Sequence, residues 1–296
     1  MISGVVILNK EEGLSSQAAV NRVKRIFGAD KAGHTGTLDP MATGVLPVLL
    51  GRGVKASEYM LTSDKHYVAT LKLGLTTDTE DITGEVLTTS DSLPEDGCVI
   101  AAAEKFVGEY MQTPPMYSAL KVGGKKLCDL ARAGVTVERE AREVRIYSLA
   151  VTPLGGGEYS LDVRCSKGTY IRTLCADIGK ALGVGGVMKT LARASAAGFL
   201  LSEAHTLGEL EAMSDEERAK CVYPVEYIFR KYREVKLSDF FARLAHSGLE
   251  IYLKKIELNL PLGELVRLSD ANGFFALGEV REFEGGAAIK PIKQFF

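Results

Sequence analysis

Apolar and polar residues follow one another in patterns that predict both strands and helices in this chain. Gly4 to Leu8 form a short apolar run, which is typical of a buried strand. Ser15 or Ser16 then provides an N-cap for a predicted helix, whose apolar positions recur at helical spacing until Gly28 ends it. Between residues 66 and 73 apolar and polar side chains alternate, so we expect a strand with one buried face.

The second half of the chain continues this mixture of patterns. Residues 142–152 and 159–165 have the composition of neighbouring strands, and the apolar positions from Ile171 to Leu182 predict a helix. The order lacks a regular βαβ rhythm, so the sequence predicts an α+β fold. After residue 230, short strand patterns are separated by Asn-Gly and Gly-Gly turns. We therefore expect a larger domain at 1–229 and a small β-rich domain at 230–296.

The overall composition narrows the class of protein. Of the 296 residues, 46% are hydrophobic and 25% are charged, which is typical of folded globular proteins. No apolar run approaches the ~18 residues that a membrane span needs. The N-terminal segment also lacks the basic start and long apolar stretch of a signal peptide. We therefore expect a cytoplasmic protein that does not bind membranes.

Cysteine and histidine spacing gives no sign of a metal site. The five cysteines are odd in number, widely spaced and free of any CxxC pair. The four histidines show none of the i, i+4 spacing that a helix-borne metal site uses. The sequence therefore predicts no disulfide framework and no bound metal.

The charges are unevenly distributed along the chain. The formal net charge of −2 argues against a uniformly basic surface for nucleic acid, yet residues 161–195 hold six Lys or Arg against two acids. Residues 112–126 combine three lysines with two prolines and paired glycines, as in an extended basic loop. A polyanion needs only a local positive surface, although a single cluster of this kind is more often a solvated face.

The candidate chemistry begins with one carboxylate. Residues 33–51 read GHTGTLDPMATGVLPVLLG, in which four glycines surround the single acid Asp39. The backbone must turn repeatedly there before the apolar run of the next strand. An isolated Asp-Pro step usually means that the aspartate only begins a turn. The shaped loop around Asp39 makes a functional carboxylate a second interpretation.

Five segments together resemble the TruB family of tRNA pseudouridine synthases. The first is GHTGTLDPxATGVLP, which is similar to the catalytic-aspartate motif of that family. Four others follow in the family's order at 66–74, 78–86, 112–127 and 164–179: HYVATLKLG, DTEDITGEV, QTPPMYSALKVGGKKL and RCSKGTYIRTLCADIG. The resemblance implies a mixed, largely antiparallel sheet core of the pseudouridine synthase type. It also implies that residues 230–296 form a PUA-like RNA-binding domain.

The resemblance implies an activity and a substrate. On this basis we expect that uridine 55 in the T-arm of tRNA is flipped out of the RNA and isomerised to pseudouridine, with Asp39 as the nucleophile and without metal or cofactor. The resemblance also implies that the basic segment 112–127 folds over the RNA and that the C-terminal domain contacts the acceptor end. We expect the protein to work as a monomer.

The resemblance also assigns six further positions to the site. Arg172 pairs with the catalytic aspartate, Tyr67 stacks on the target uracil, and His34 contacts the T-loop where the base is extruded. Lys10 matches a lysine near the active site, and Tyr170 and Leu191 match two positions that line the pocket. Residue type alone leaves other readings open, since an arginine on a helix is commonly exposed and a tyrosine or leucine is commonly part of the core.

Three rival functions remain to be weighed. GTLDP is similar to the GTxDP phosphate loop of nucleotidyltransferases, but the histidine pair that those enzymes need downstream is missing. A guide-RNA-dependent pseudouridine synthase shares the core and a PUA domain, and a non-catalytic RNA-binding or tRNA-folding protein could use the same scaffold. The sequence leaves open whether Asp39 attacks ribose C1′ or uracil C6.

Overall fold

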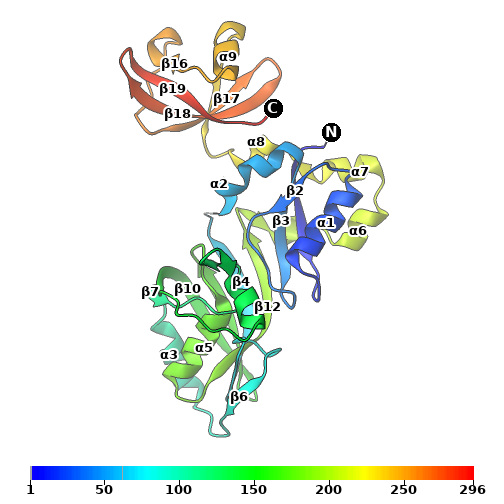
Figure 1. Ribbon diagram of the computed structural model, residues 1–296, viewed down its shortest axis with the longest axis vertical. Helices are drawn as coiled ribbons and strands as arrows, with labels where there is room; N and C mark the ends of the chain where they lie inside the picture. The colour runs from blue at the N-terminus through cyan, green and yellow to red at the C-terminus, as the bar shows by residue number, and fades with distance from the viewer. Residues whose placement is uncertain (1, 62) are drawn as a thin grey trace.

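The computed structural model describes residues 2–61 and 63–296 and shows an elongated molecule with two main sheets (Figure 1). The strands of the larger sheet are β1 (Gly4–Lys10), β2 (Ala32–His34), β3 (Thr43–Leu50), β4 (Lys65–Leu73), β7 (Gly108–Gln112), β10 (Arg142–Gly155), β11 (Glu158–Cys165), β12 (Gly186–Ala196), β13 (Phe199–Leu200) and β14 (Val222–Tyr223). Those of the C-terminal sheet are β15 (Arg233–Lys236), β16 (Ile251–Tyr252), β17 (Leu265–Asp270), β18 (Gly273–Phe283) and β19 (Gly286–Gln294).

Two small hairpins and the helices complete the element order. The hairpins pair β5 (Leu75–Thr77) with β6 (Val86–Thr89), and β8 (Lys121–Val122) with β9 (Lys125–Lys126). The helices are α1 (Ser16–Ile26), α2 (Ser57–Leu61), α3 (Asp96–Glu104), α4 (Leu127–Arg132), α5 (Ile171–Ala181), α6 (Leu207–Ala212), α7 (Asp215–Lys220), α8 (Val225–Ile228) and α9 (Asp239–His246). Short 3-10 turns lie at Gly51–Ala56, Leu201–Glu203 and Leu253–Lys255. No helix among the described residues is long and apolar enough to cross a membrane.

The larger sheet is mixed and mostly antiparallel, which confirms the predicted fold class. Its strand order is β14-β1-β3-β12-β4-β11-β10-β7, with β2 and β13 paired at the side to β3 and β12. The pairing of β3 with β12 is parallel, whereas the other pairings described in this sheet are antiparallel. That parallel contact joins β1 and β3 to β12, β4, β11, β10 and β7, which form the lower part of the molecule in Figure 1.

Local sequence explains the elements that were predicted correctly. The Ser15 hydroxyl accepts a hydrogen bond from the Ala18 N–H at 3.2 Å and caps α1, and Gly28 follows the helix with a φ of 57°. In β4 the alternate residues Tyr67, Ala69 and Leu71 are buried, as the apolar alternation predicts.

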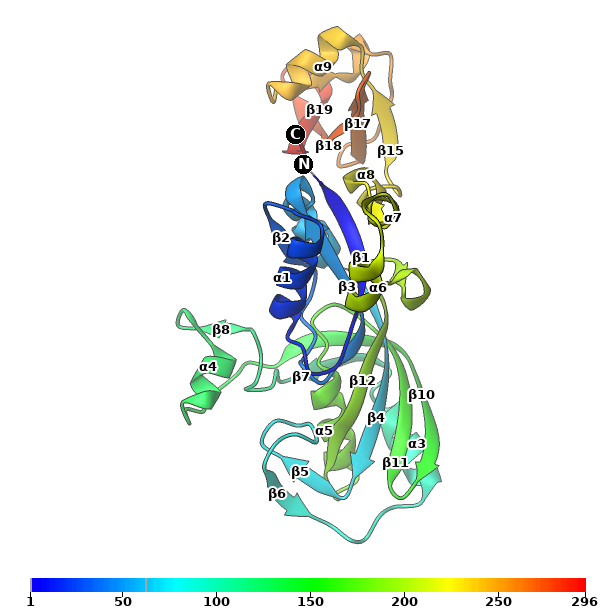
Figure 2. The ribbon, with the colours of Figure 1, turned by 90° about the vertical axis from the view of Figure 1, so that its right-hand side faces the viewer.

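Two segments differ from the sequence-based expectation. Strand β12 was not predicted, although it lies between β3 and β4 in the centre of the sheet. The basic loop expected at 112–126 contains the β8–β9 hairpin and leads directly into α4. Figure 2 shows this hairpin and α4 projecting away from the body of the molecule as an arm.

The C-terminal sheet has its own apolar core, but it also packs against the larger unit. Its order is β15-β17-β18-β19-β16, and Val266, Leu268 and Ile289 are buried within it. A separate apolar cluster contains residues from both units: Ala56, Val225, Phe229, Leu277 and Phe295. The division at residue 230 therefore falls beside a buried cluster and stays a prediction.

Phe229 provides a test of this cluster. Its ring is 0% exposed and lies near the rings of Tyr59, Phe274 and Phe295, with centroids 5.2 to 5.7 Å apart. Phe229→Ala should lower the free energy of unfolding of the full chain by about 3 to 5 kcal/mol, because it leaves a cavity between the two units. Phe240→Ala is the matched control, since Phe240 is 58% exposed. Equal urea unfolding curves for the two variants would contradict the contribution of the cluster.

Candidate active site

Asp39 lies on the loop between β2 and β3, and local contacts fix that loop on both sides of the carboxylate. The Ser16 hydroxyl at the start of α1 bonds both the N–H and the carbonyl of Leu38, each at 2.8 Å. On the other side, the Pro40 carbonyl accepts hydrogen bonds from the Gly13 N–H at 2.8 Å and from the Lys10 ammonium at 3.1 Å. The serine that begins the helix thus also orders the loop.

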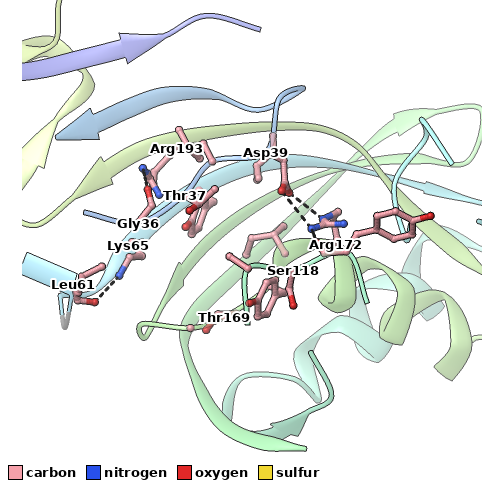
Figure 3. A pocket seen from close by; sticks show the side chains of 17 residues that line it. Gly36, Thr37, Asp39, Leu61, Lys65, Ser118, Thr169, Arg172 and Arg193 are labelled. Atoms are coloured by element: carbon pink, nitrogen blue, oxygen red, sulfur yellow. Dashed lines mark hydrogen bonds and ion pairs between the residues drawn. The ribbon is translucent and has the colours of Figure 1, made fainter. Parts of the chain in front are cut away.

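Arg172 meets Asp39 from the first turn of α5. Its Nε lies 3.0 Å from Oδ2 and its Nη2 lies 3.3 Å from Oδ1, so the guanidinium contacts both carboxylate oxygens. Figure 3 shows the two contacts as dashed lines. The Arg172 side chain is only 5% exposed and that of Asp39 is 33% exposed. A planar fork on a carboxylate fixes both its distance and its orientation.

Other segments fix the position of Arg172. Its Nη1 donates to the Thr79 carbonyl at 3.0 Å, and its Nη2 donates to the Tyr117 carbonyl at 2.8 Å. A second carboxylate, that of Asp81, lies 3.8 Å from Nη1. Asp81 is itself buried, and one of its oxygens accepts hydrogen bonds from the Thr83 hydroxyl and backbone. The arginine therefore connects the Asp39 loop to two other segments, one that contains Thr79 and Asp81 and one that contains Tyr117.

Burial and the nearby arginine act on Asp39 in opposite directions. Burial raises the pKa of the Asp39 carboxyl, because the charged form loses solvation. The charge of Arg172 offsets part of that rise. The ion pair therefore limits the cost of keeping a carboxylate in a cavity and does not make Asp39 a stronger acid than usual.

A cavity of about 340 Å³ opens beside this pair. That volume is near the lower end of the range of about 300 to 1,000 Å³ for small-molecule sites. Five of the residues expected at the site line it, namely Asp39, Tyr67, Tyr170, Arg172 and Leu191. They come from one loop, two strands and the start of one helix, so the fold brings together positions that are distant in sequence.

Tyr67 and Tyr170 are placed by different means. Tyr67 is 7% exposed on β4, and burial raises the pKa of its phenol. Tyr170 precedes α5, and its backbone bonds twice to the Gln112 side chain, at 2.8 and 3.0 Å. Both rings lie against a cavity that also meets the apolar side chain of Leu191. This wall can pack against a flat, weakly polar ring.

The other two expected residues, Lys10 and His34, lie outside the cavity lining. Lys10 is fully buried, and its ammonium donates to three carbonyls at 2.7 to 3.1 Å, those of Glu11, Leu14 and Pro40. Its position supports the loop that carries Asp39. His34 is on β2, and burial together with the Arg193 charge lowers the pKa of its imidazole. Direct contact of either side chain with a substrate stays a prediction.

Two cations that the sequence did not predict at the site also line the cavity, Lys65 and Arg193. Arg193 is 0% exposed and donates from Nε to the Val45 carbonyl at 2.7 Å and from Nη2 to the Gly36 carbonyl at 3.1 Å. A Cβ on Gly44 would lie 2.3 Å from the Arg193 carbonyl oxygen, so the strands can approach here only because residue 44 is glycine. The sequence did contain a signal for Arg193. It lies two residues after Leu191, so in a strand it is a charged residue on the same face as an apolar one.

Among the described residues, no three His, Cys, Asp or Glu side chains cluster in a way that could hold a metal ion. The chemistry that the cavity itself offers is that of an oriented carboxylate beside a permanent cation. Such a carboxylate can act as a nucleophile or accept a proton.

Comparison with known proteins identifies the family. The N-terminal domain model of the TruB family pseudouridylate synthases matches residues 24–171. The tRNA pseudouridylate synthase B C-terminal domain model matches residues 172–230. The chain belongs to the TruB family. The expected fold and family are thereby confirmed.

The names of individual relatives agree with this family assignment. A tRNA pseudouridine synthase B from Francisella tularensis subsp. holarctica is 40% identical over 298 residues, covering 100% of this chain and 95% of the relative. One from Neisseria meningitidis serogroup B is 39% identical, covering 93% and 88%. A chain of the crystal structure of a Cbf5-Nop10-Gar1 complex has a TM-score of 0.72 and 28% identity, covering 99% of this chain and 85% of that one.

The balance of charges at Asp39 can be measured directly. Because burial raises the pKa of this carboxyl and Arg172 counteracts the rise, its NMR titration should give a pKa above 3.8. In Arg172→Gln the pKa should rise further, since the compensating cation is gone. The Asp39→Asn spectrum identifies the resonance by its loss. An unchanged or lower pKa in Arg172→Gln would show that the ion pair does not stabilise the charged form.

Proposed function

We propose that this protein isomerises uridine to pseudouridine at position 55 in the T-arm of tRNA. The observation that carries the proposal is the two-point contact of Arg172 with Asp39, in a cavity that Tyr67 also lines. The names of the relatives, at about 40% identity over the whole chain, support a tRNA substrate.

The reaction must break the bond between uracil N1 and ribose C1′, turn the base and form a bond between C1′ and uracil C5, after which C5 loses its proton and N1 gains one. Attack by the Asp39 carboxylate on ribose C1′ or on uracil C6 would begin it, and both routes need the ionised, oriented oxygen that Arg172 maintains. The detached base must stay in the cavity, where Tyr67 and Leu191 can pack against it. Flipping the nucleotide costs a few kcal/mol, which contacts in the cavity must offset.

The rest of the substrate would lie across the outer surface. The projecting arm carries Lys121, Lys125 and Lys126, and its base lies next to the site through the contact of the Tyr117 carbonyl with Arg172. The C-terminal unit would contact the acceptor end. Action as a monomer and a cytoplasmic location remain predictions.

A guide-RNA-dependent enzyme is the second candidate, because the fold also resembles a chain of the Cbf5-Nop10-Gar1 complex. The identity of 40% to proteins named tRNA pseudouridine synthase B, against 28% for that chain, favours an enzyme that acts on tRNA by itself.

Incubating the purified protein with an unmodified tRNA transcript, and no other RNA or protein, tests the proposal. Pseudouridine should form at position 55 and nowhere in a transcript with cytidine at that position. Pseudouridine that appears only after a guide RNA and partner proteins are added would support the second candidate. Tight tRNA binding without any product would favour a non-catalytic role.

Asp39→Asn should abolish turnover, with a loss of about 10³-fold or more, because the amide keeps the shape but not the nucleophilic charge. Binding of tRNA should change little. The matched control is Asp215→Asn, since the Asp215 side chain is 97% exposed on α7. Single-turnover assays with excess enzyme provide the measurement. A rate near that of the parent in Asp39→Asn would remove the nucleophile from the scheme.

Neutralising the arm should weaken the salt dependence of tRNA binding. Replacing Lys121, Lys125 and Lys126 together by Gln should lower the slope of log K against log salt by about 2 to 3, close to one for each phosphate contact. A variant with Lys105→Gln and Lys220→Gln, both exposed elsewhere, is the control. An unchanged slope in the arm variant, measured by filter binding over several salt concentrations, would mean that the arm does not touch phosphate.

A further inference from the structure

The cavity has a positively charged side that the Asp39 chemistry does not use. Of the three cations that line it, Arg172 pairs with Asp39, whereas Lys65 and Arg193 have no carboxylate oxygen of the described residues within 4.0 Å. Figure 3 shows Lys65 and the contact of Arg193 with Gly36 on the side of the cavity opposite the Asp39–Arg172 contacts. Asp39 is the one carboxylate among the described lining residues.

Both cations are oriented by neutral groups. The Lys65 ammonium donates to the Ser63 carbonyl at 2.5 Å and to the Leu61 carbonyl at 3.5 Å. An ammonium has three N–H groups, so a donor remains for a ligand. Arg193, fully buried, uses two nitrogens on the carbonyls of Val45 and Gly36. Carbonyl dipoles fix these side chains without neutralising their charge.

An uncompensated charge away from water is costly, and proteins usually pair or solvate it. Burial and the neighbouring Arg193 lower the pKa of Lys65, so its charged form is less favoured than that of a freely solvated lysine. An anion beside Lys65 would relieve this penalty. Such a feature is expected where a ligand brings negative charge into a site.

Building on the proposed function, we infer that the Lys65 side of the cavity is a subsite for a phosphodiester group adjoining the target nucleotide. Lys65 donates a hydrogen bond to a non-bridging phosphate oxygen, and Arg193 adds positive charge from behind it. The ribose and base then extend towards Asp39 and Tyr67. A charge-assisted contact of this kind helps to offset the cost of flipping the nucleotide.

Neutral phosphate analogues provide the test. T-arm hairpins are made with a single methylphosphonate linkage 5′ of the target uridine, 3′ of it, or in the stem away from it. Binding is measured with the full-length Asp39→Asn protein, so that turnover does not interfere. One of the two adjacent substitutions should weaken binding about tenfold, as expected for one lost charge-assisted hydrogen bond, and the stem substitution should have a smaller effect.

The lysine is tested in the same background. Lys65→Met should weaken binding of the unmodified hairpin about tenfold and show no further loss on the sensitive methylphosphonate hairpin. Lys72→Met is the matched control on the same strand, because Lys72 bonds the Gly156 carbonyl and does not line the cavity. It should respond to the methylphosphonate as the parent background does.

Two results would overturn the subsite. One is equal binding of all the hairpins by the protein with Lys65 intact. This measurement does not depend on the folding of any Lys65 variant. The other is an additional tenfold loss for Lys65→Met on the sensitive hairpin. Failure of the proposed function is a separate result, since it appears as absence of pseudouridine when the parent protein meets the unmodified hairpin.

Discussion

The contact of Arg172 with Asp39 is the interaction on which the site depends. It joins residues 133 positions apart, one on the β2–β3 loop and one at the start of α5. Burial alone would favour the neutral carboxyl, and the arginine counteracts that preference while orienting both oxygens. Because Arg172 also bonds the carbonyls of Thr79 and Tyr117, the same guanidinium connects Asp39 to the base of the projecting arm.

Pairing at the centre of the larger sheet positions the loop that carries Asp39. The parallel pairing of β3 with β12 sets Gly44 against Arg193, and Asp39 precedes this point on the chain. Backbone approach at Gly44 and the Arg193 bonds to Gly36 and Val45 restrain both ends of the loop. The Asp39 carboxylate therefore stands on a loop, but a buried sheet fixes the loop, as a preorganised site requires.

The molecule reconciles a slightly negative total charge with a polyanionic substrate by placing its cations unequally. Arg172 and Arg193 belong to the basic stretch 161–195, yet both are buried and serve the cavity. The other four cations of that stretch, Arg164, Lys167, Lys180 and Lys189, are exposed, as are the lysines of the arm, and these side chains are free to meet RNA from outside. The cations of the sequence therefore have two roles. Buried cations act inside the cavity and exposed cations attract RNA, and salt screens the exposed ones more strongly.

The sequence by itself determined the α+β class, the buried face of β4 and the capped helix α1, and it predicts a functional role for Asp39, because each is encoded in neighbouring residues or in a continuous motif. Motif resemblance also placed Arg172, Tyr67, Tyr170 and Leu191, which the fold gathers around one cavity. Tertiary structure alone decided the central position of β12, the lack of a carboxylate partner for Lys65 and Arg193 among the described residues, and the apolar contact between the two units. These features depend on which distant segments exclude water from one another, and that has no signature in local periodicity.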